Sequence, residues 1–383
     1  MTDVWTWPAE IGVLFGVLLF VVLLVPILAI QVRRYGAISL VRLIGAAALA
    51  IYGTALLAYT LLPLPGGDLA AWCTQHGHEG AQLRPGQIFA DIRERTAGLS
   101  LGATVRDISV LQGVFNVVLF VPWGILVRRY LGWGLLASAA SALAASLLIE
   151  TTQLTGIFGL IPCSYRLADV DDLVTNTVGG VLGALVAPWV LRWMPGARTL
   201  TAARGVPRPV TVWRRWLGMA VDAAAYGGLS FVLSITWGLV TYLTTGLAAS
   251  DTAVSWLVTS VLPWLAVFLY PLVTGAGESL GQRTVWLAVV PDGDGAGLSA
   301  RARARRGLAG GALWGLLQVL ADASTTFDVG VLDGAAALGF VLGVVYVVAA
   351  PFSVGKRGLS GRMAPYRLAD ARQPELRPSR PSR

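Results

Sequence analysis

The residues Ser146-Leu-Leu-Ile-Glu150-Thr-Thr-Gln153 end one long apolar run, and Asp169-Val-Asp-Asp172-Leu-Val-Thr-Asn176 begin the next. Both runs are hydrophobic enough to belong in a membrane, where one carboxylate costs about 2.5 to 3.5 kcal/mol at mid-depth. A chain keeps such residues when they have partners, water or a function. This stretch therefore predicts membrane helices that carry a polar site.

The composition of the whole chain agrees with a membrane protein. Of its 383 residues, 55% are hydrophobic and 13% are charged, whereas about 25% charged residues are usual in soluble proteins. We predict an all-α, polytopic helical membrane protein with about nine transmembrane helices. The predicted spans are residues 11–32, 40–62, 108–127, 131–154, 172–191, 216–243, 252–274, 307–321 and 333–352.

The basic residues predict the direction of the chain through the membrane. With the N-terminus outside, 24 of the 29 basic residues fall on the inside, as the positive-inside rule requires. We therefore predict an N-out, C-in, multi-pass protein of a bacterial cytoplasmic (inner) membrane. This topology places Cys73 and Cys163 in outer loops, where a disulfide is expected to persist; two free thiols are the alternative.

Polar side chains of three predicted spans converge at one depth on the outer side. Glu150 and Gln153 are spaced i, i+3 near the outer end of one span. Three more polar residues are spaced i, i+3, i+7 at the outer end of the next, which places them on one helix face. We predict a ligand-binding site made of Asn116, Glu150, Gln153, Asp169, Asp172 and Asn176. The alternative is that these groups only hydrogen-bond one another and hold the helices together.

Three ordered motifs in residues 36–195 resemble the VanZ-like family. They are Asn116-Val-Val-Leu-Phe-Val-Pro-Trp-Gly124, the Ser146–Gln153 stretch, and Asp169-Val-Asp-Asp-Leu-Val-Thr-Asn-Thr-Val-Gly-Gly180. The name-giving member of that family is associated with resistance to teicoplanin, a lipidated glycopeptide that acts on outer cell-wall precursors. The resemblance implies an envelope protein that modulates glycopeptide sensitivity.

A second polar pattern lies in the other half of the chain. Arg215 and Asp222 are two helical turns apart, and Asp222 lies inside a predicted span, so it needs a partner or a proton-handling role. Together with Gly277-Glu-Ser-Leu-Gly-Gln-Arg283, this spacing resembles the RDD family over residues 210–370. Some members of that family resemble cation/proton exchangers. We expect Leu280, Val285, Leu287 and Val289 to lie in the membrane interface, with Arg283 toward acidic headgroups.

These patterns predict the domain organisation. The predicted segments are an extra N-terminal helix (1–35), a VanZ-like membrane domain (36–195), a cytoplasmic linker (196–209), an RDD-like membrane domain (210–370) and a disordered tail (371–383).

We predict a non-enzymatic envelope factor whose outward-facing acidic groove binds an amphiphile or lipid-linked precursor. One alternative is a cation- or proton-coupled transporter that uses Asp222 and Glu150. Another is a membrane enzyme that acts on a lipid-linked substrate with Glu150 and Asp172 as its acid/base pair. The expected partners are membrane lipids and a lipid-linked cell-wall precursor or lipoglycopeptide. We expect no nucleic acid, no cofactor and no metal, although His76-Gly-His78-Glu79 beside Cys73 has ligand-type side chains.

Overall fold

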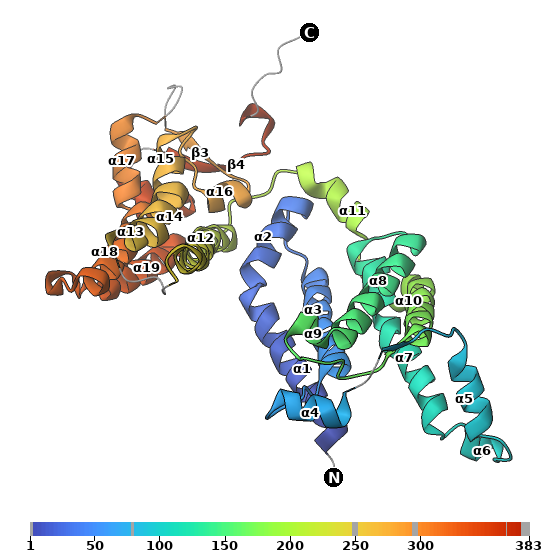
Figure 1. The fold of residues 1–383 in the computed structure, drawn as a ribbon. Helices are drawn as coiled ribbons and strands as arrows, with labels where there is room; N and C mark the ends of the chain where they lie inside the picture. Colours follow the sequence, from blue (N-terminus) through green and yellow to red (C-terminus); the bar gives the residue numbers. More distant parts are fainter. Residues whose placement is uncertain (1–2, 78–79, 247–251, 293–297, 365, 377–383) are drawn as a thin grey trace, which may run out of the picture. The chain divides into compact units, whose positions relative to one another are not determined.

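A computed structural model describes residues 3–77, 80–246, 252–292, 298–364 and 366–376 of the chain. Contacts within the chain divide it into two compact units (Figure 1). Unit 1 comprises Met1–Leu23 and Ser39–Leu200, and unit 2 comprises Leu24–Ile38 and Thr201–Arg383. The division after Leu200 lies inside the predicted linker, whereas Leu24–Ile38 joins the second unit and not the N-terminal segment.

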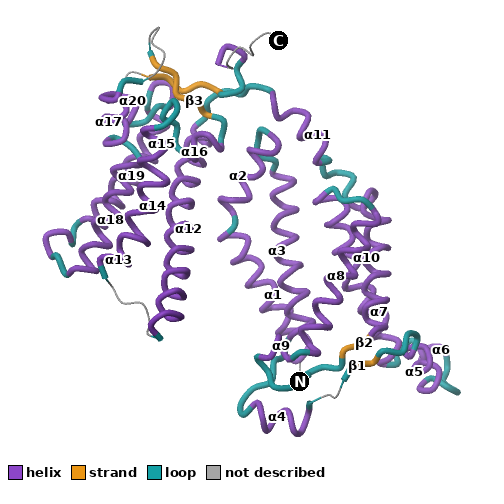
Figure 2. The backbone as a smooth tube through the Cα atoms, turned by 45° about the horizontal axis from the view of Figure 1, so that its top comes forward, coloured by secondary structure: helices purple, strands orange, loops and turns teal. Residues whose placement is uncertain are grey.

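Unit 1 is a bundle of long helices with smaller elements at one end. The long helices are α1 (Asp3–Val22), α3 (Leu40–Leu61), α7 (Ile108–Ile125), α8 (Leu135–Leu154) and α10 (Val170–Val190). The smaller elements are α4 (Leu69–His76), β1 (Ala81–Gln82), α5 (Gln87–Arg95), α6 (Leu101–Thr104), α9 (Gly156–Gly159) and β2 (Ala168–Asp169), and α11 (Ala197–Ala202) leads out of the unit. Figure 2 shows α5, α6 and the two short strands beside the N-terminal end of α7.

Helices α7 and α10 pack closely because glycines remove the side chains between them. A Cβ at Gly179 would lie 2.1 Å from the carbonyl oxygen of Val117, and one at Gly183 would lie 2.0 Å from that of Val121. Small residues four apart allow this approach. Pro122 lies inside this helix: α7 continues to Ile125, and a π-helix extends it through Leu126–Leu131.

Unit 2 is built around the 34-residue helix α12 (Val212–Thr245). The other helices are α2 (Leu24–Tyr35), α13 (Ala253–Trp256), α14 (Leu262–Trp264), α15 (Tyr270–Val273), α16 (Leu280–Thr284), α17 (Ala300–Leu308), α18 (Gly311–Phe327), α19 (Ala335–Phe352) and α20 (Ser360–Met363). Two π-helical segments, Leu257–Val261 and Leu265–Leu269, join α13, α14 and α15 into one span, Ala253–Val273.

A two-stranded antiparallel sheet closes one end of unit 2. Strand β3 (Leu287–Pro291) pairs with β4 (Tyr366–Asp370), so that Leu287 faces Asp370 in the register. Figure 2 shows β3, α16, α17 and α20 gathered at the N-terminal end of α12. Of the residues expected in the membrane interface, Leu280 is 44% exposed, but the expectation is wrong for Val285, Leu287 and Val289, whose exposed fractions are only 0%, 1% and 4%. They pack into the core of unit 2 instead.

The predicted fold class, an all-α polytopic membrane protein, is confirmed. Among the described residues, seven helices are long and apolar enough to cross a bilayer, and α1 with α2 make an eighth if they form one bent span. The predicted span at 307–321 is displaced: α18 begins at Gly311 and has 17 residues, about 26 Å at 1.5 Å per residue. The count of nine and the orientation stay predictions.

The end of the chain differs from the predicted disordered tail at 371–383. Arg372 is 3% exposed and is hydrogen-bonded to Asp370. Residues 374–376 form a 3₁₀ turn, and the part of the predicted tail beyond residue 376 lies outside the described residues.

Candidate functional site

The polar residues predicted from unit 1 come from three helices that meet at one end of the bundle. The side-chain amide of Asn116 on α7 donates a 2.6 Å hydrogen bond to the carboxylate of Asp172 on α10. The carboxylate of Glu150 on α8 accepts a 3.0 Å hydrogen bond from the backbone N–H of Asp169. We call Asn116, Glu150 and Asp172 the acidic cluster. It connects the middle of α7 with the C-terminal part of α8 and the first turn of α10, and Glu150 within it is 7% exposed.

Two of the predicted amides serve the framework around this cluster. Gln153 donates to the carbonyl oxygen of Thr60 at 2.7 Å, which ties the end of α8 to the end of α3. Asn176 donates to the hydroxyl of Ser146 at 2.9 Å, and both residues are buried. Hydrogen-bonded buried amides stabilise helix packing, and the contact of Gln153 fits that alternative. The side-chain oxygen of Asn176 is buried without a hydrogen-bond partner among the described residues, so Asn176 stays a predicted ligand-binding residue.

Asp169 points towards the segment that precedes α5. Its carboxylate accepts hydrogen bonds from the side chain of Gln82 and from the backbone N–H of Asp171. Burial raises the pKa of Asp169, and the nearby charge of Asp171 raises it further. Asp169 therefore positions the strand pair β1–β2, in which Gln82 faces Asp169.

Asp171 was not predicted to have a role, yet it is the acidic residue of this region with the lowest exposed fraction, 4%. Its two carboxylate oxygens accept the backbone N–H groups of Gly86 and Ile88, at 2.6 and 2.8 Å. It therefore anchors the start of α5 to the start of α10. The position of Asp171 between the predicted site residues Asp169 and Asp172 indicates a role for it. Its partners, the backbone N–H groups of Gly86 and Ile88, follow no sequence pattern.

Glu150 and Asp172 form no ion pair within the part of the chain that the structure describes. Arg166, a nearby basic residue, donates to the carbonyl oxygens of Thr60 and Leu62. No ion pair within 4.0 Å joins Arg166 to a described carboxylate. Buried carboxylates without a cation are costly, so the acidic cluster can accept a cation, a proton or a hydrogen-bond donor from a ligand.

Cys73 and Cys163 are joined by a disulfide, with their Cα atoms 5.8 Å apart. The bond links α4 to the segment between α9 and β2. His76 stacks on Trp72, and its proposed companions His78 and Glu79 lie outside the described residues.

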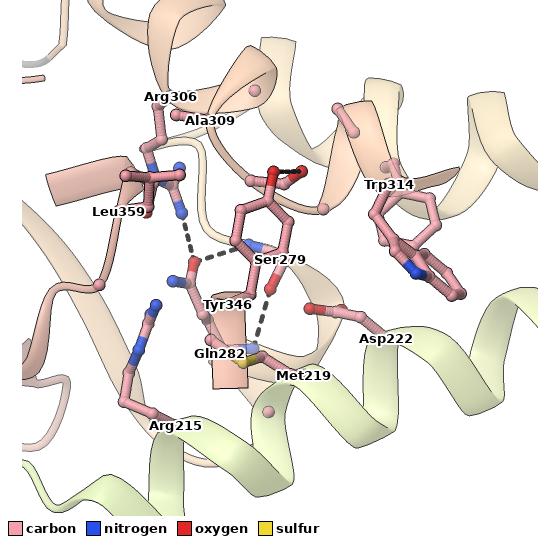
Figure 3. Close-up of a pocket in the computed structure, with 18 of the residues that line it drawn as sticks. Arg215, Met219, Asp222, Ser279, Gln282, Arg306, Ala309, Trp314, Tyr346 and Leu359 are labelled. Atoms are coloured by element: carbon pink, nitrogen blue, oxygen red, sulfur yellow. Dashed lines mark hydrogen bonds between the residues drawn. The ribbon is translucent and has the colours of Figure 1, made fainter. Parts of the chain in front are cut away.

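The second predicted pair, Arg215 and Asp222, lies on α12 in unit 2 and lines a cavity of about 380 Å³. Asp222 accepts a 2.6 Å hydrogen bond from the backbone N–H of Gly281. No ion pair joins Arg215 to Asp222 among the described residues. Figure 3 shows both side chains on α12, with Arg306 and Gln282 beside Arg215 and the ring of Trp314 on the opposite side of the view.

The sequence pattern did not indicate the ion-pair network around Asp370, which is 1% exposed. Arg214 and Arg372 form ion pairs with its carboxylate at 3.0 and 2.7 Å, and the backbone N–H of Arg208 donates to it at 3.0 Å. Burial opposes the charge of Asp370, but the hydrogen bonds from Arg372 and Arg208 and the charge of Arg214 outweigh it and lower its pKa to about 2. This network holds β4 against the start of α12.

Trp286, next to β3, is surrounded by basic side chains within unit 2. Its indole N–H donates to the carbonyl oxygen of Val32 at 3.0 Å. The guanidinium carbons of Arg33, Arg204 and Arg372 lie 4.4, 5.2 and 5.4 Å from the centre of its ring. These cation–π contacts and the Asp370 network connect α2, β3 and β4.

Comparison with known proteins identifies one part of the chain. No curated protein and no solved structure matches it. Residues 49–192 match the family model described as VanZ/LLP1. This match covers most of unit 1 and includes all three members of the acidic cluster. The chain therefore contains a VanZ-like membrane segment at residues 49–192.

Proposed function

We propose that unit 1 binds the polar headgroup of an amphiphile at the acidic cluster, on the predicted outer side of a bacterial cytoplasmic membrane. The observation that carries the proposal is the pair Glu150 and Asp172, two carboxylates from different helices that form no ion pair with a described basic residue. An amine or several hydroxyl donors on a ligand would compensate their buried charge.

The VanZ-like segment supports a role in the cell envelope. A lipid-linked cell-wall precursor or a lipoglycopeptide of the teicoplanin type places a polar headgroup beside a membrane anchor. Its acyl part would lie in the bilayer along α7 and α10, whose apolar side chains Val114, Val118 and Val178 are exposed. By binding such a molecule, the protein would alter the sensitivity of the cell to glycopeptide antibiotics.

Binding to purified protein tests this function. A fluorescent lipoglycopeptide or lipid-linked precursor is titrated against the full chain in lipid nanodiscs, with the variants Glu150→Gln and Glu94→Gln. Glu94 is an exposed carboxylate on α5 outside the cluster, so its variant is the matched control. We expect weaker binding by Glu150→Gln only. Equal binding by all three proteins, or lipoglycopeptide susceptibility unaffected by Glu150→Gln at normal protein levels in cells, would contradict the proposal.

The alternative function is cation- or proton-coupled transport through unit 2. Its support is that Asp222 lines the cavity, and that the resemblance of residues 210–370 to the RDD family rests on Arg215, Asp222 and Gly277–Arg283. The two arginines that line the same cavity oppose a bound cation electrostatically. Proton or sodium flux into proteoliposomes that is abolished by Asp222→Asn would favour transport over headgroup binding.

A further inference from the structure

The cavity of unit 2 has one strongly basic side. Its charged lining residues are Arg215, Asp222 and Arg306. Arg215 and Arg306 are 6% and 7% exposed, and neither forms an ion pair with a described carboxylate. With Asp222 ionised, the lining therefore carries a net positive charge.

Arg306 is held in place by neighbouring polar groups. It donates to the carbonyl oxygen of Gly277 and to the side-chain oxygen of Gln282, and its guanidinium carbon lies 5.3 Å from the ring centre of Tyr366. Gln282 in turn is fixed by a capping box with Ser279 at the start of α16. The position of Arg306 beside the cavity is thus built by two helices, α16 and α17.

Arg215 has almost no partner. Its one hydrogen bond within the described residues is a long contact of 3.4 Å to the carbonyl oxygen of Arg357, and its Nε is buried without any hydrogen-bond partner. Asp222 lines the same cavity but forms no ion pair with Arg215, and a buried guanidinium without an ion pair is strongly unfavourable. The planar guanidinium group of Arg215 presents several N–H donors at the wall of the cavity, an arrangement that suits the binding of an oxyanion.

The cavity also has a large apolar lining. Met219, Phe268, Trp314 and Val347 belong to it, and Figure 3 shows the ring of Trp314 across the view from Arg215 and Arg306. An anion that is small and fully hydrated would leave this surface without a partner, whereas an acyl chain would cover it.

We propose that the cavity of unit 2 binds an anionic phospholipid, with the phosphate group at Arg215 and Arg306 and an acyl chain against Trp314 and Phe268. The phosphate oxygens supply the charge that Arg215 lacks. Asp222, hydrogen-bonded to Gly281 at 2.6 Å, borders the phosphate site and disfavours a second anion. This site is separate from the acidic cluster of unit 1, so either proposal can fail without the other.

The test uses native mass spectrometry of the full chain in detergent, with four probes: phosphatidic acid, diacylglycerol with the same chains, phosphatidylcholine and inorganic phosphate. Phosphatidic acid is expected to bind most tightly. Phosphatidylcholine, whose choline cation offsets the phosphate charge, is expected to bind less tightly, and diacylglycerol without a phosphate and inorganic phosphate without acyl chains are expected to bind weakly. Arg215→Gln is expected to weaken phosphatidic acid at least about tenfold. Arg305→Gln, which removes an exposed arginine of α17 outside the cavity, is expected to leave the affinity unchanged.

Equal binding of phosphatidic acid and diacylglycerol would overturn the phosphate site, and equal binding of phosphatidic acid and inorganic phosphate would overturn the acyl site. Equal affinities of Arg215→Gln and Arg305→Gln would overturn the role of Arg215. If Arg215→Gln does not fold, the ranking of the four probes on the unaltered chain still decides. A purely structural Arg215 predicts that the lipid-free Arg215→Gln protein melts at a lower temperature, whereas an uncompensated charge predicts no loss of stability.

Discussion

The side-chain amide of Asn116 donates a 2.6 Å hydrogen bond to the carboxylate of Asp172, 56 residues later in the chain. Among the described residues, no other group donates a hydrogen bond to that carboxylate, so loss of the Asn116 amide leaves a half-buried charge unsatisfied. Asn116→Leu should lower the free energy of unfolding by about 1 to 3 kcal/mol. Thermal unfolding of the purified protein in detergent measures the change.

A double variant distinguishes the loss of the hydrogen bond between Asn116 and Asp172 from a general destabilisation of the helices. In Asn116→Leu/Asp172→Leu neither partner of the hydrogen bond remains, so the double variant should be less destabilised than the sum of the two single variants. Strict additivity would show that Asn116 and Asp172 do not interact.

Asp171 should control the order of the segment before α5. Its carboxylate accepts the backbone N–H groups of Gly86 and Ile88, and hydrogen bonds to a charged group contribute about 1.5 to 3 kcal/mol each. Asp171→Ala should therefore speed the hydrogen exchange of these two amides markedly. Glu94→Ala, which changes an exposed residue of α5, is the matched control. Unchanged exchange at Gly86 and Ile88 would contradict the anchoring role.

The helices and the acidic cluster were predictable because both depend on local periodicity. The ends of an apolar run predict how deep each of its residues lies in the membrane. A spacing of three or four residues predicts which side chains share one face of a helix. Asn116, Glu150 and Asp172 were assigned to the same level from these rules, and the structure brings them together through the hydrogen bonds of Asn116 and Glu150.

Contacts that depend on chain segments without periodicity were not predictable. Asp370 lies in β4, which pairs with β3 through Leu287, and no repeat or turn signal connects two strands so far apart in sequence. The break between α1 and α2 at Leu23 is different, because a sequence signal for it exists. Pro26 has no N–H to donate to the carbonyl oxygen of Val22 and its ring clashes with that carbonyl, but the prediction of a single span at residues 11–32 took no account of it.

The ion pairs of Asp370 should make unit 2 sensitive to acid. The pKa of Asp370 in the folded protein is about 2, below its ordinary value of 3.8. Its contribution to stability is therefore present above about pH 4 and is lost as the pH falls towards 2. Asp370→Asn should lower stability at neutral pH and flatten the decline in the free energy of unfolding between pH 4 and 2, as measured by unfolding at a series of pH values.

The control is Asp292→Asn, which removes a half-exposed ion pair with Arg357. An identical dependence of stability on acid pH for the two variants would exclude Asp370 as the source of the acid sensitivity.

The predicted topology places both cysteines outside the cell. The chain has two cysteines, and they are joined to one another. After mild reduction of intact cells, a membrane-impermeant maleimide should label the protein, and without reduction it should not. A variant with both cysteines replaced by serine and Arg305→Cys introduced should be labelled only after permeabilisation, because residue 305 is predicted to lie inside. The reverse pattern would invert the topology.

The packing of α7 against α10 should depend on Gly183. A Cβ at this position would lie 2.0 Å from the carbonyl oxygen of Val121, so Gly183→Ala must push the helices apart, at a cost of about 1 to 3 kcal/mol. Gly53 in α3 is the matched control, because a Cβ there would meet nothing within 4 Å. Gly53→Ala should keep or raise the melting temperature, since alanine favours a helix by about 0.5 to 1 kcal/mol over glycine.

Separation of α7 from α10 would also lengthen the hydrogen bond between Asn116 and Asp172, so Gly183→Ala should weaken ligand binding at the acidic cluster as well as stability. A Gly183→Ala protein that melts like Gly53→Ala would show that the close contact of the two helices is not required.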